Sequence, residues 1–331
     1  MPADDRAMPG VVKPVASVTG PNLLESLGWV GGYFFLQNLA LGGTIALIAL
    51  AAFGTLAVSW DQLVGLMVEL DLDRSFVLIG VPGLAALLVM LPLVRWRLGP
   101  DWRESLQLGR PTFRQILLGL GAVLPLGILS DEVYRQALAG WRALWDIPEM
   151  AETPLGNLGA QILAVPYPVL IVALALGPAV GEELVFRGLI GRGLTIRRGV
   201  VAGVLWTSLL FGAAHAFPPH AISTVFVGLF LHVLYLATGN LWAPILVHAL
   251  VNGLAVTHLK LEGIATFETS PTVLFAASGY LLVVGTLLWH LRSHEPGAPR
   301  RVVMPTRMFP YLASCSVLSY TLVSVWTLMN G

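Results

Sequence analysis

The sequence predicts an all-α fold, a polytopic membrane helix bundle with about eight or nine transmembrane helices. Of the 331 residues, 56% are hydrophobic and only 11% are charged, whereas soluble domains carry about 25% charged residues. The mean hydropathy is +0.77. A single soluble core has too little volume for so much apolar surface, but a bundle of spanning helices buries that surface in lipid.

Apolar stretches alternate along the chain with segments that contain Gly, Pro and charge, as membrane spans and their interfacial loops should. We expect four parts: a disordered leader at 1–25, N-terminal helices and loops at 26–158, a core at 159–260, and two C-terminal helices at 261–331. The candidate spans run over about Val30–Val58, Phe76–Val94, Ile116–Leu129, Ala160–Leu189, Val200–His215, Ala221–Leu236, Leu241–Val256, Val273–Leu291 and Phe309–Met329.

The basic residues predict the orientation, because cytoplasmic loops of membrane proteins carry an excess of Lys and Arg. If the N-terminus is cytoplasmic and the nine stretches alternate, most basic residues fall inside. The outer segments then contain only Arg74, Arg135, Arg142 and Lys260. We therefore expect the C-terminus outside. Arginine far outnumbers lysine, and Ala and Gly are abundant, which favours a GC-rich bacterial genome and hence the bacterial plasma membrane.

Charge and cysteine content exclude several partners and cofactors. The formal net charge is zero, so nothing indicates a nucleic-acid partner. A single cysteine, Cys315, excludes an internal disulfide and a cysteine-rich metal site. The expected partners are the lipid bilayer and, from the motifs below, a peptide or membrane-protein substrate.

Charged residues interrupt the fourth apolar stretch at Glu182, Glu183 and Arg187. A charge at the centre of a membrane helix costs about 2.5–3.5 kcal/mol, so such groups persist where they pair, line a wet cavity or carry chemistry. Glu183 and Arg187 are four residues apart with the acid first, the favourable order for an ion pair. Glu182 points about 100° away and has no partner nearby in sequence, which suits a general base. A purely architectural ion-pair cluster is the alternative, but it explains Glu182 poorly.

Two more motifs add polar groups to neighbouring spans. His215 ends the fifth stretch in FGAAH, and the four-residue spacing of His248 and Asn252 in HALVN puts both side chains on one helix face. Two donors that converge on one point are what an oxyanion hole requires. Either motif alone also fits packing, since His and Asn often hydrogen-bond across membrane helices. The remaining histidines are interpreted as loop, interface or packing residues: His220, His232, His258, His290 and His294.

The combination predicts hydrolysis of an acyl bond, with a peptide as the preferred substrate. Water is the expected nucleophile, because no Ser or Cys lies in a recognisable nucleophile motif. Glu182, His215 and His248 form an alternative zinc site with an open position. We prefer a site without metal or other cofactor, because no HExxH spacing is present and Asn252 fits an oxyanion donor better than a ligand.

The three motifs resemble those of the CPBP family, the CAAX-protease-like intramembrane endopeptidases. This family includes the type II prenyl-protein protease and bacteriocin-processing or immunity (Abi-like) proteins. EELVFR, FGAAH and HALVN are in the family's order, and the resemblance covers roughly Ala160 to His258. It implies a CAAX-protease-like core and a glutamate-dependent, metal-free peptidase. The roles that it implies are water activation for Glu182 and His215, oxyanion stabilisation for His248 and Asn252, and support for Glu183 and Arg187.

Two functions from other classes stay open. A transporter would use Glu182, His215 and His248 as a proton or ion relay, although the sequence contains no inverted repeat. A non-catalytic immunity or binding protein would keep the same polar cluster without turnover. If the protein is a peptidase of a bacterial cell, a peptide precursor, a lipoprotein-like tail or a signalling membrane protein is a more natural substrate than a prenylated protein.

One prediction conflicts with a shared site. Counting about 1.5 Å per residue from the inner loops places Glu182 roughly 15–24 Å deep and His215 about 25 Å deep, but His248 only about 12 Å deep. Residues that act together should lie at one depth. Helix tilt, a kink near Pro178 or shifted span ends would be needed to reconcile these depths.

Overall fold

In the computed structural model every element of the described residues is a helix, which confirms the all-α prediction, and no strand occurs among them. They are residues 20–57, 59, 62, 72–145, 165–215, 217–261 and 269–292. The elements are α1 (Leu23–Phe53), α3 (Leu72–Leu98), α4 (Trp102–Ser105), α5 (Phe113–Trp145), α7 (Tyr167–Leu170), η2 (Ile171–Leu176), α8 (Gly177–Glu183), η3 (Leu184–Gly191), α9 (Arg192–Arg198), α10 (Val200–Ala213), α11 (Pro218–Thr238), α12 (Trp242–Lys260) and α13 (Pro271–Arg292).

The protein is an integral membrane protein. Within the described ranges, six helices are long and apolar enough to cross a bilayer. The helix α3 overlaps the second predicted stretch, and α10, with 14 residues, is shorter than the roughly 20 residues that a full span needs. The ninth stretch, Phe309–Met329, and most of the leader lie outside the described residues, so a total of eight or nine spans stays a prediction. The six spans are Leu23–Phe53, Phe113–Trp145, Tyr167–Arg198, Pro218–Thr238, Trp242–Lys260 and Pro271–His290.

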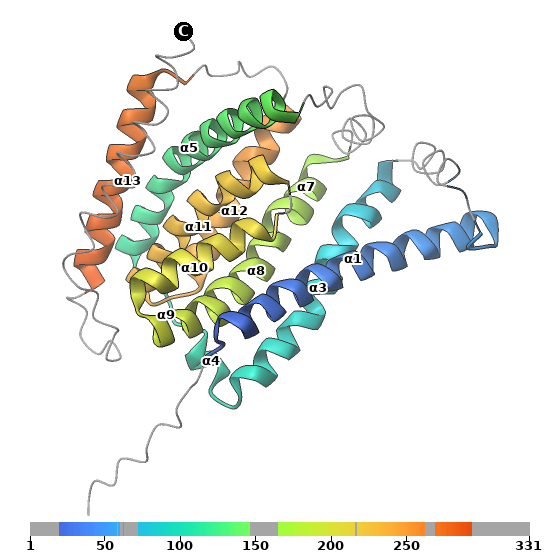
Figure 1. Ribbon diagram of the computed structural model, residues 1–331, viewed down its shortest axis with the longest axis horizontal. Helices are drawn as coiled ribbons and strands as arrows, with labels where there is room; N and C mark the ends of the chain where they lie inside the picture. The colour runs from blue at the N-terminus through green and yellow to red at the C-terminus, as the bar shows by residue number, and fades with distance from the viewer. Residues whose placement is uncertain are drawn as a thin grey trace, which may run out of the picture.

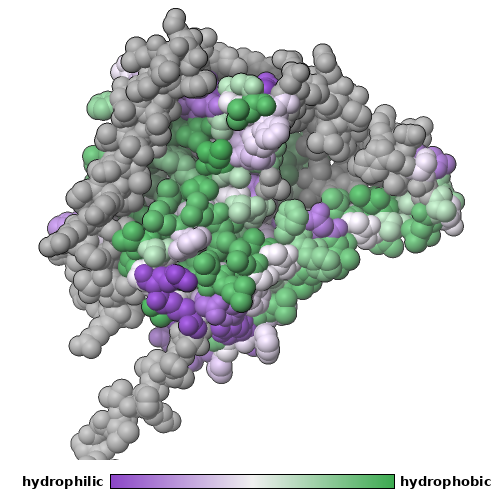
Figure 2. Space-filling view, viewed as in Figure 1, coloured by the Kyte–Doolittle hydropathy of each residue, from purple (hydrophilic) through white to green (hydrophobic). Residues whose placement is uncertain are grey.

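The outer surface of the bundle is apolar, as a lipid-facing surface should be. Leu88 is 73% exposed and Phe35 is 63% exposed. In Figure 2 hydrophobic side chains cover the middle of the visible face, and hydrophilic ones gather at its lower end, where Figure 1 shows α9 and α4. An apolar belt with polar residues at one end is the pattern of a helix bundle in a bilayer.

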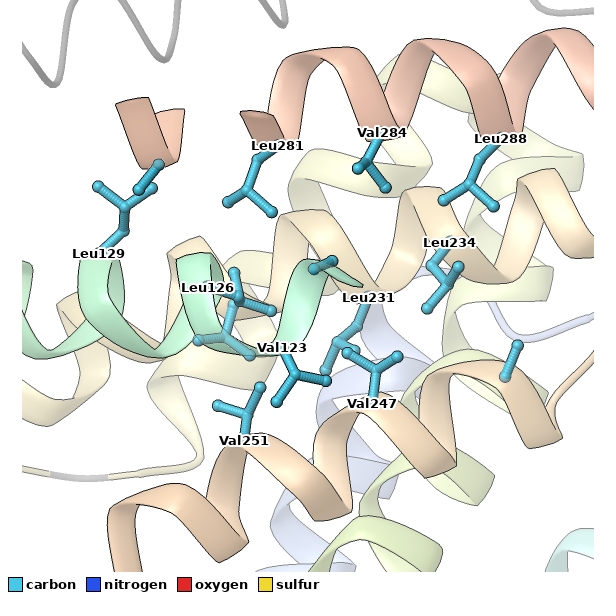
Figure 3. Close-up of a cluster of buried hydrophobic side chains, with 14 of the residues drawn as sticks. Val123, Leu126, Leu129, Leu231, Leu234, Val247, Val251, Leu281, Val284 and Leu288 are labelled. Atoms are coloured by element: carbon cyan, nitrogen blue, oxygen red, sulfur yellow. The ribbon is translucent and has the colours of Figure 1, made fainter. Parts of the chain in front are cut away.

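The largest core cluster joins α5, α11, α12 and α13. Figure 3 shows Leu126 of α5, Leu231 of α11, Val247 of α12 and Val284 of α13 pointing toward one another. All four side chains are nearly or fully buried. This core holds α12 in place from behind, so that the opposite face of α12 is presented to α8 and η2, which it also contacts.

Contacts between connecting segments sort the helix ends into two groups. At one end, the first turn of α1 meets the last turn of α3, Gly20 meets α9, and the segment between α4 and α5 meets the turn between α11 and α12. At the other end, the second half of α5 meets the residue before α13, and the last residue of α12 meets the segment before α7. The contacts of the first group are Glu25 with Arg97 (2.5 Å), Gly20 with Arg197 (2.7 Å) and Gln107 with Leu241 (3.1 Å); those of the second are Arg135 with Thr269 (2.8 Å) and Lys260 with Val165 (2.9 Å).

Two helices continue beyond the predicted span ends. The helix α5 runs to Trp145 rather than ending near Leu129, because Asp131 pairs with Arg135 at 3.1 Å across one helical turn and so the charged segment remains helical. The fourth stretch also continues as a helix, to Arg198. The predicted inner loop at 190–199 is therefore wrong, and the chain reverses at Gly199.

Two glycines make this reversal possible. Gly199 adopts a φ of 81°, a conformation that glycine reaches without a Cβ clash. Further along, a Cβ at Gly203 would lie 2.6 Å from the Cα of Thr195. The backbones of α9 and α10 are therefore in direct contact, and this contact sets the position of α10 along η3.

Gly203→Ala should destabilise the bundle, because the new methyl group would force α9 and α10 apart. We expect a loss of about 1–3 kcal/mol, the usual cost of an overpacked contact, seen as a lower thermal midpoint in detergent. Gly140→Ala in α5 is the matched control, because a Cβ there meets no atom within 4 Å. Equal midpoints for the two variants would contradict the close contact.

Candidate active site

The charged motif lies in the middle of a long helix. Glu182 and Glu183 close α8, and Arg187 follows in η3 without a break in the helix. The candidate span that contains them runs from Tyr167 to Arg198. Both η2 and η3 are π-helical, and π-helical turns often occur at functional sites because they reorient side chains relative to a regular α-helix.

The Glu183 carboxylate is shared between two cationic or hydrogen-donating partners. Its Oε1 accepts a hydrogen bond from Arg187 Nη1 at 2.6 Å and another from His248 Nδ1 at 2.8 Å. The Glu183 and Arg187 side chains are both 0% exposed. A charge buried this completely is tolerated only when it is paired and hydrogen-bonded. The pair predicted from the helical spacing is therefore present, and it extends to α12.

Arg187 links this pair to two further helices. Its Nη2 donates to the carbonyl oxygen of Gly228 in α11 at 3.1 Å. Its guanidinium lies 4.4 Å from the centroid of the Phe211 ring in α10, a distance at which a cation is attracted to an aromatic face. A Cβ at Gly228 would meet Phe211 at 3.0 Å, so glycine allows this approach. One arginine thus contacts three helices.

The contacts of His248 show which ring nitrogen binds Glu183 and which one faces Glu182. Nδ1 faces the Glu183 carboxylate, so Nδ1 carries a proton and donates it. Nε2 faces Glu182 Oε2 at 3.8 Å. In the neutral ring Nε2 would be an acceptor opposite another acceptor, whereas an imidazolium would donate from both nitrogens.

His215 also donates from Nδ1, but to an uncharged backbone carbonyl. Its Nδ1 lies 2.9 Å from the carbonyl oxygen of Phe211, and a carbonyl only accepts, so Nδ1–H is the donor. The neutral ring therefore keeps its Nε2 lone pair. His215 and Glu182 line the same cavity of about 130 Å³, together with Tyr33, Phe34, Gln37, Phe186 and Ala214.

The structure removes the predicted difference in depth. Glu182 lies almost as many residues before Gly199 as His215 lies after it. Because the chain reverses at Gly199, the two residues lie at a similar height along the two antiparallel helices. The α11–α12 turn does not reach the end of the bundle as the count assumed. Leu241 packs against Gly188 instead, and Glu182 and His248 are almost equally far from that contact along their own helices.

Asn252 is less closely engaged than the other three. It lies one turn beyond His248 on α12 and is partly buried. Within the part of the chain that the structure describes, its side chain makes no hydrogen bond. Neither Asn252 nor His248 is among the residues that line the cavity, although His248 faces Glu182 beside it.

The zinc alternative requires three ligands at one point. Among the described residues, no group of three or more His, Cys, Asp or Glu side chains could hold a metal ion. Glu182, His215 and His248 therefore do not form the carboxylate-His-His set that the sequence allowed.

Two residues beside the site were not expected there. His220, interpreted as a loop or packing residue, lies in the first turn of α11 with its ring 4.7 Å from that of His215; its closeness to His215 in the sequence was a signal. Tyr33 lines the cavity from α1. Nothing in the sequence links it to motifs so much further along the chain.

Comparison with protein families agrees with this geometry. The matching family model is described as type II CAAX prenyl endopeptidase Rce1-like, and it covers residues 164–254. Residues 164–254 form an Rce1-like domain. The resemblance predicted from the three motifs is confirmed, because this family is the type II branch of the CAAX proteases. No curated protein and no solved structure matches the chain.

The Rce1-like domain contains Glu182, Glu183, Arg187, His215, His220, His248 and Asn252. Of the residues that line the cavity, Tyr33, Phe34 and Gln37 lie outside it. The domain begins just before α7 and ends within α12, so α1, α3, α5 and α13 lie outside it. A domain of a CAAX endopeptidase family implies a peptide substrate. The helix α1 therefore contributes to the cavity of a peptidase-family domain from outside that domain.

Arg187→Met should destabilise the protein strongly, because it leaves the Glu183 carboxylate buried and only half paired. We expect a loss of about 3–5 kcal/mol, the usual result of removing one partner of a buried ion pair, measured by thermal or denaturant unfolding in detergent. Arg114→Met, which removes an exposed guanidinium from α5, is the control and should change stability little. If both variants unfold alike, the buried pair does not have the role assigned to it.

Proposed function

We propose that this protein is an intramembrane endopeptidase in which Glu182 and His215 activate a water molecule for attack on a peptide bond. The observation that supports this most is the cavity that these two side chains line. It offers two proton acceptors, and Glu182 also faces a His248 nitrogen at 3.8 Å. A base and a donor that face one point are the minimum set for acyl hydrolysis.

In the proposed reaction, residues of this chain accept and return the proton of the water and bind the oxyanion. Water attacks the carbonyl carbon while Glu182, with His215 Nε2 beside it, takes one proton. The carbonyl oxygen becomes an oxyanion, to which His248 Nε2–H and the Asn252 amide donate. The retained proton then passes to the leaving nitrogen as the C–N bond breaks, which leaves an acid and an amine.

Glu183 and Arg187 have supporting roles in this scheme. His248 can donate from Nε2 while Nδ1 is engaged with Glu183 only as an imidazolium. The Glu183 carboxylate stabilises that cation, and Arg187 balances the charge of Glu183. The two residues thereby orient His248 and keep it able to donate.

The proposed topology has a cytoplasmic N-terminus, an external C-terminus and eight or nine spans in a bacterial plasma membrane. The grouping of helix ends supports it, because contacts such as Glu25–Arg97 join only segments expected inside and Arg135–Thr269 joins segments expected outside. In a chain whose Cys315 is replaced by Ser, Arg198→Cys should react with impermeant thiol reagents only from the cytoplasmic side, and Ser270→Cys only from the other. Labelling of both from one side would contradict the topology.

Glu182→Gln should abolish cleavage, because an amide cannot accept the proton of the attacking water. We expect a fall in turnover of at least about 100-fold, within the range for a general base, without a change in thermal midpoint. Comparison of membrane and secreted peptides from cells with the wild-type and variant proteins also identifies the uncut substrate. Glu104→Gln, an exposed acid on α4, is the control and should process normally.

Other outcomes distinguish the rival functions. Normal processing by a folded Glu182→Gln variant refutes Glu182 as the base. Flux of protons or ions through reconstituted vesicles that depends on pH, without a cleaved product, would instead indicate a relay by the same residues. Neither flux nor cleavage would indicate a binding or immunity role.

Chelation tests the metal question separately. Because Glu182 and His215 are proposed to activate water without a Lewis acid, treatment with 1,10-phenanthroline or EDTA should leave turnover unchanged. A loss of turnover that added zinc restores would contradict the metal-free mechanism and reinstate the zinc alternative.

A further inference from the structure

The cavity next to Glu182 has a second polar wall, and it comes from α1. Of the seven lining residues, Tyr33, Phe34 and Gln37 belong to α1, which lies outside the Rce1-like domain. Tyr33 and Gln37 are one helical turn apart and face Glu182 and His215. A cavity with four hydrogen-bonding side chains and about 130 Å³ is polar and roomy enough for water.

Tyr33 differs from its neighbours on α1. Phe34 is 44% exposed and Phe35 is 63% exposed, whereas Tyr33 is 4% exposed. Tyr33 belongs to the same buried cluster as Phe186 of η3 and Phe211 of α10. A phenol turned inward from the exposed side of α1 must satisfy its hydroxyl there, because lipid offers no hydrogen-bond partner.

Tyr33 and Gln37 lie one turn apart on α1 and line the same cavity, so a hydrogen bond between their side chains would leave a donor for that cavity in either direction. If the amide donates to the phenol oxygen, the O–H remains free to donate elsewhere. If the phenol donates to the amide oxygen, the NH₂ group keeps both of its hydrogens. The pair therefore presents at least one N–H or O–H to the space that Glu182 and His215 also line.

Glycine allows the phenol to lie directly beside the base. A Cβ at Gly181 would come within 2.8 Å of the Tyr33 hydroxyl, so any larger residue would push the ring away. Gly181 immediately precedes Glu182, and Tyr33 and Glu182 line the same cavity. The hydroxyl is thus fixed at the backbone that carries the proposed base.

We propose that α1 completes the active site, and that the Tyr33 hydroxyl, held by Gln37, positions the water that Glu182 and His215 activate. This inference rests on the proposed function and extends it to a helix outside the family domain. Glu182 and His215 supply proton acceptors, and an additional donor from α1 orients the lone pair of the water toward the substrate carbonyl. Tyr33 is a positioning residue, because it acts through that water.

The test compares Tyr33→Phe with Glu182→Gln on the peptide that accumulates uncut when Glu182 is replaced. Tyr33→Phe removes one oxygen and keeps the ring, so we expect about a tenfold lower kcat, an unchanged KM and an unchanged thermal midpoint, the loss expected for one hydrogen bond. Tyr280→Phe, on α13 and away from the cavity, is the matched control and should retain full turnover.

The two variants distinguish failure of this inference from failure of the proposed peptidase function. If Glu182→Gln blocks processing and Tyr33→Phe has a wild-type kcat, α1 has no part in the site while the peptidase function stands. If Glu182→Gln processes normally, the peptidase function fails and the role of Tyr33 fails with it. A rise in KM with kcat unchanged would also overturn the positioning role, since it would make Tyr33 a substrate contact.

A second measurement does not depend on turnover, so it tests the proposal even if the Tyr33→Phe variant fails to fold. In a Cys315→Ser chain, Gln37→Cys should react with a water-soluble methanethiosulfonate at least tenfold faster than Leu39→Cys. Leu39 is 57% exposed on the same helix but faces lipid, where the thiolate does not form. Equal rates would mean that the cavity beside α1 is not wet and would overturn the proposal.

Discussion

The Glu183 carboxylate, buried between Arg187 and His248, is the interaction on which the rest of the site depends. In lipid-embedded protein an unpaired charge is costly enough to prevent folding, so each of the three groups requires the others. Because Arg187 also contacts Gly228 of α11 and Phe211 of α10, the same cluster fixes four helices relative to one another. Glu182, the next residue in the chain, is carried into place by its neighbour.

Close contacts between helices place Glu182, His215 and His248 at a similar depth in the bundle. Gly203 brings α10 against α9, and Gly188 receives Leu241 from the α11–α12 turn. The first contact sets His215 level with Glu182, and the second does the same for His248. Two glycines therefore control the site, Gly203 about three helical turns from His215 and Gly188 fewer than about two turns from Glu182.

Much of this arrangement was predictable from the sequence, and the physical reasons are local. The Glu183–Arg187 pair follows from helical spacing, and the apolar stretches follow from hydropathy. The identity of the partner of Glu183 was not predictable, because a helix crossing between α8 and α12 has no local signature. The depth of His248 was wrongly predicted, since loop residues were assumed to lie at the surface while Leu241 packs inside.

The ends of helices also depend on more than hydropathy. Hydropathy placed the end of the third span near Leu129, but α5 continues without a break to Trp145, with an ion pair between Asp131 and Arg135 across one turn of the extension. Tyr33 could not be predicted at all, because only the tertiary packing of α1 brings it to Glu182. Local patterns thus predict which residues carry chemistry, and long-range packing determines which of them meet.

The most direct test of this account is a double-mutant cycle between Glu183 and His248. Glu183→Gln, His248→Phe and the double variant are compared with the wild type by unfolding in detergent. If the buried carboxylate ties α8 to α12, the two substitutions should be non-additive, with a coupling of about 1–3 kcal/mol, as for residues in one buried network. Additive effects would mean that the two side chains do not meet, and the convergence of helices at the site would be contradicted.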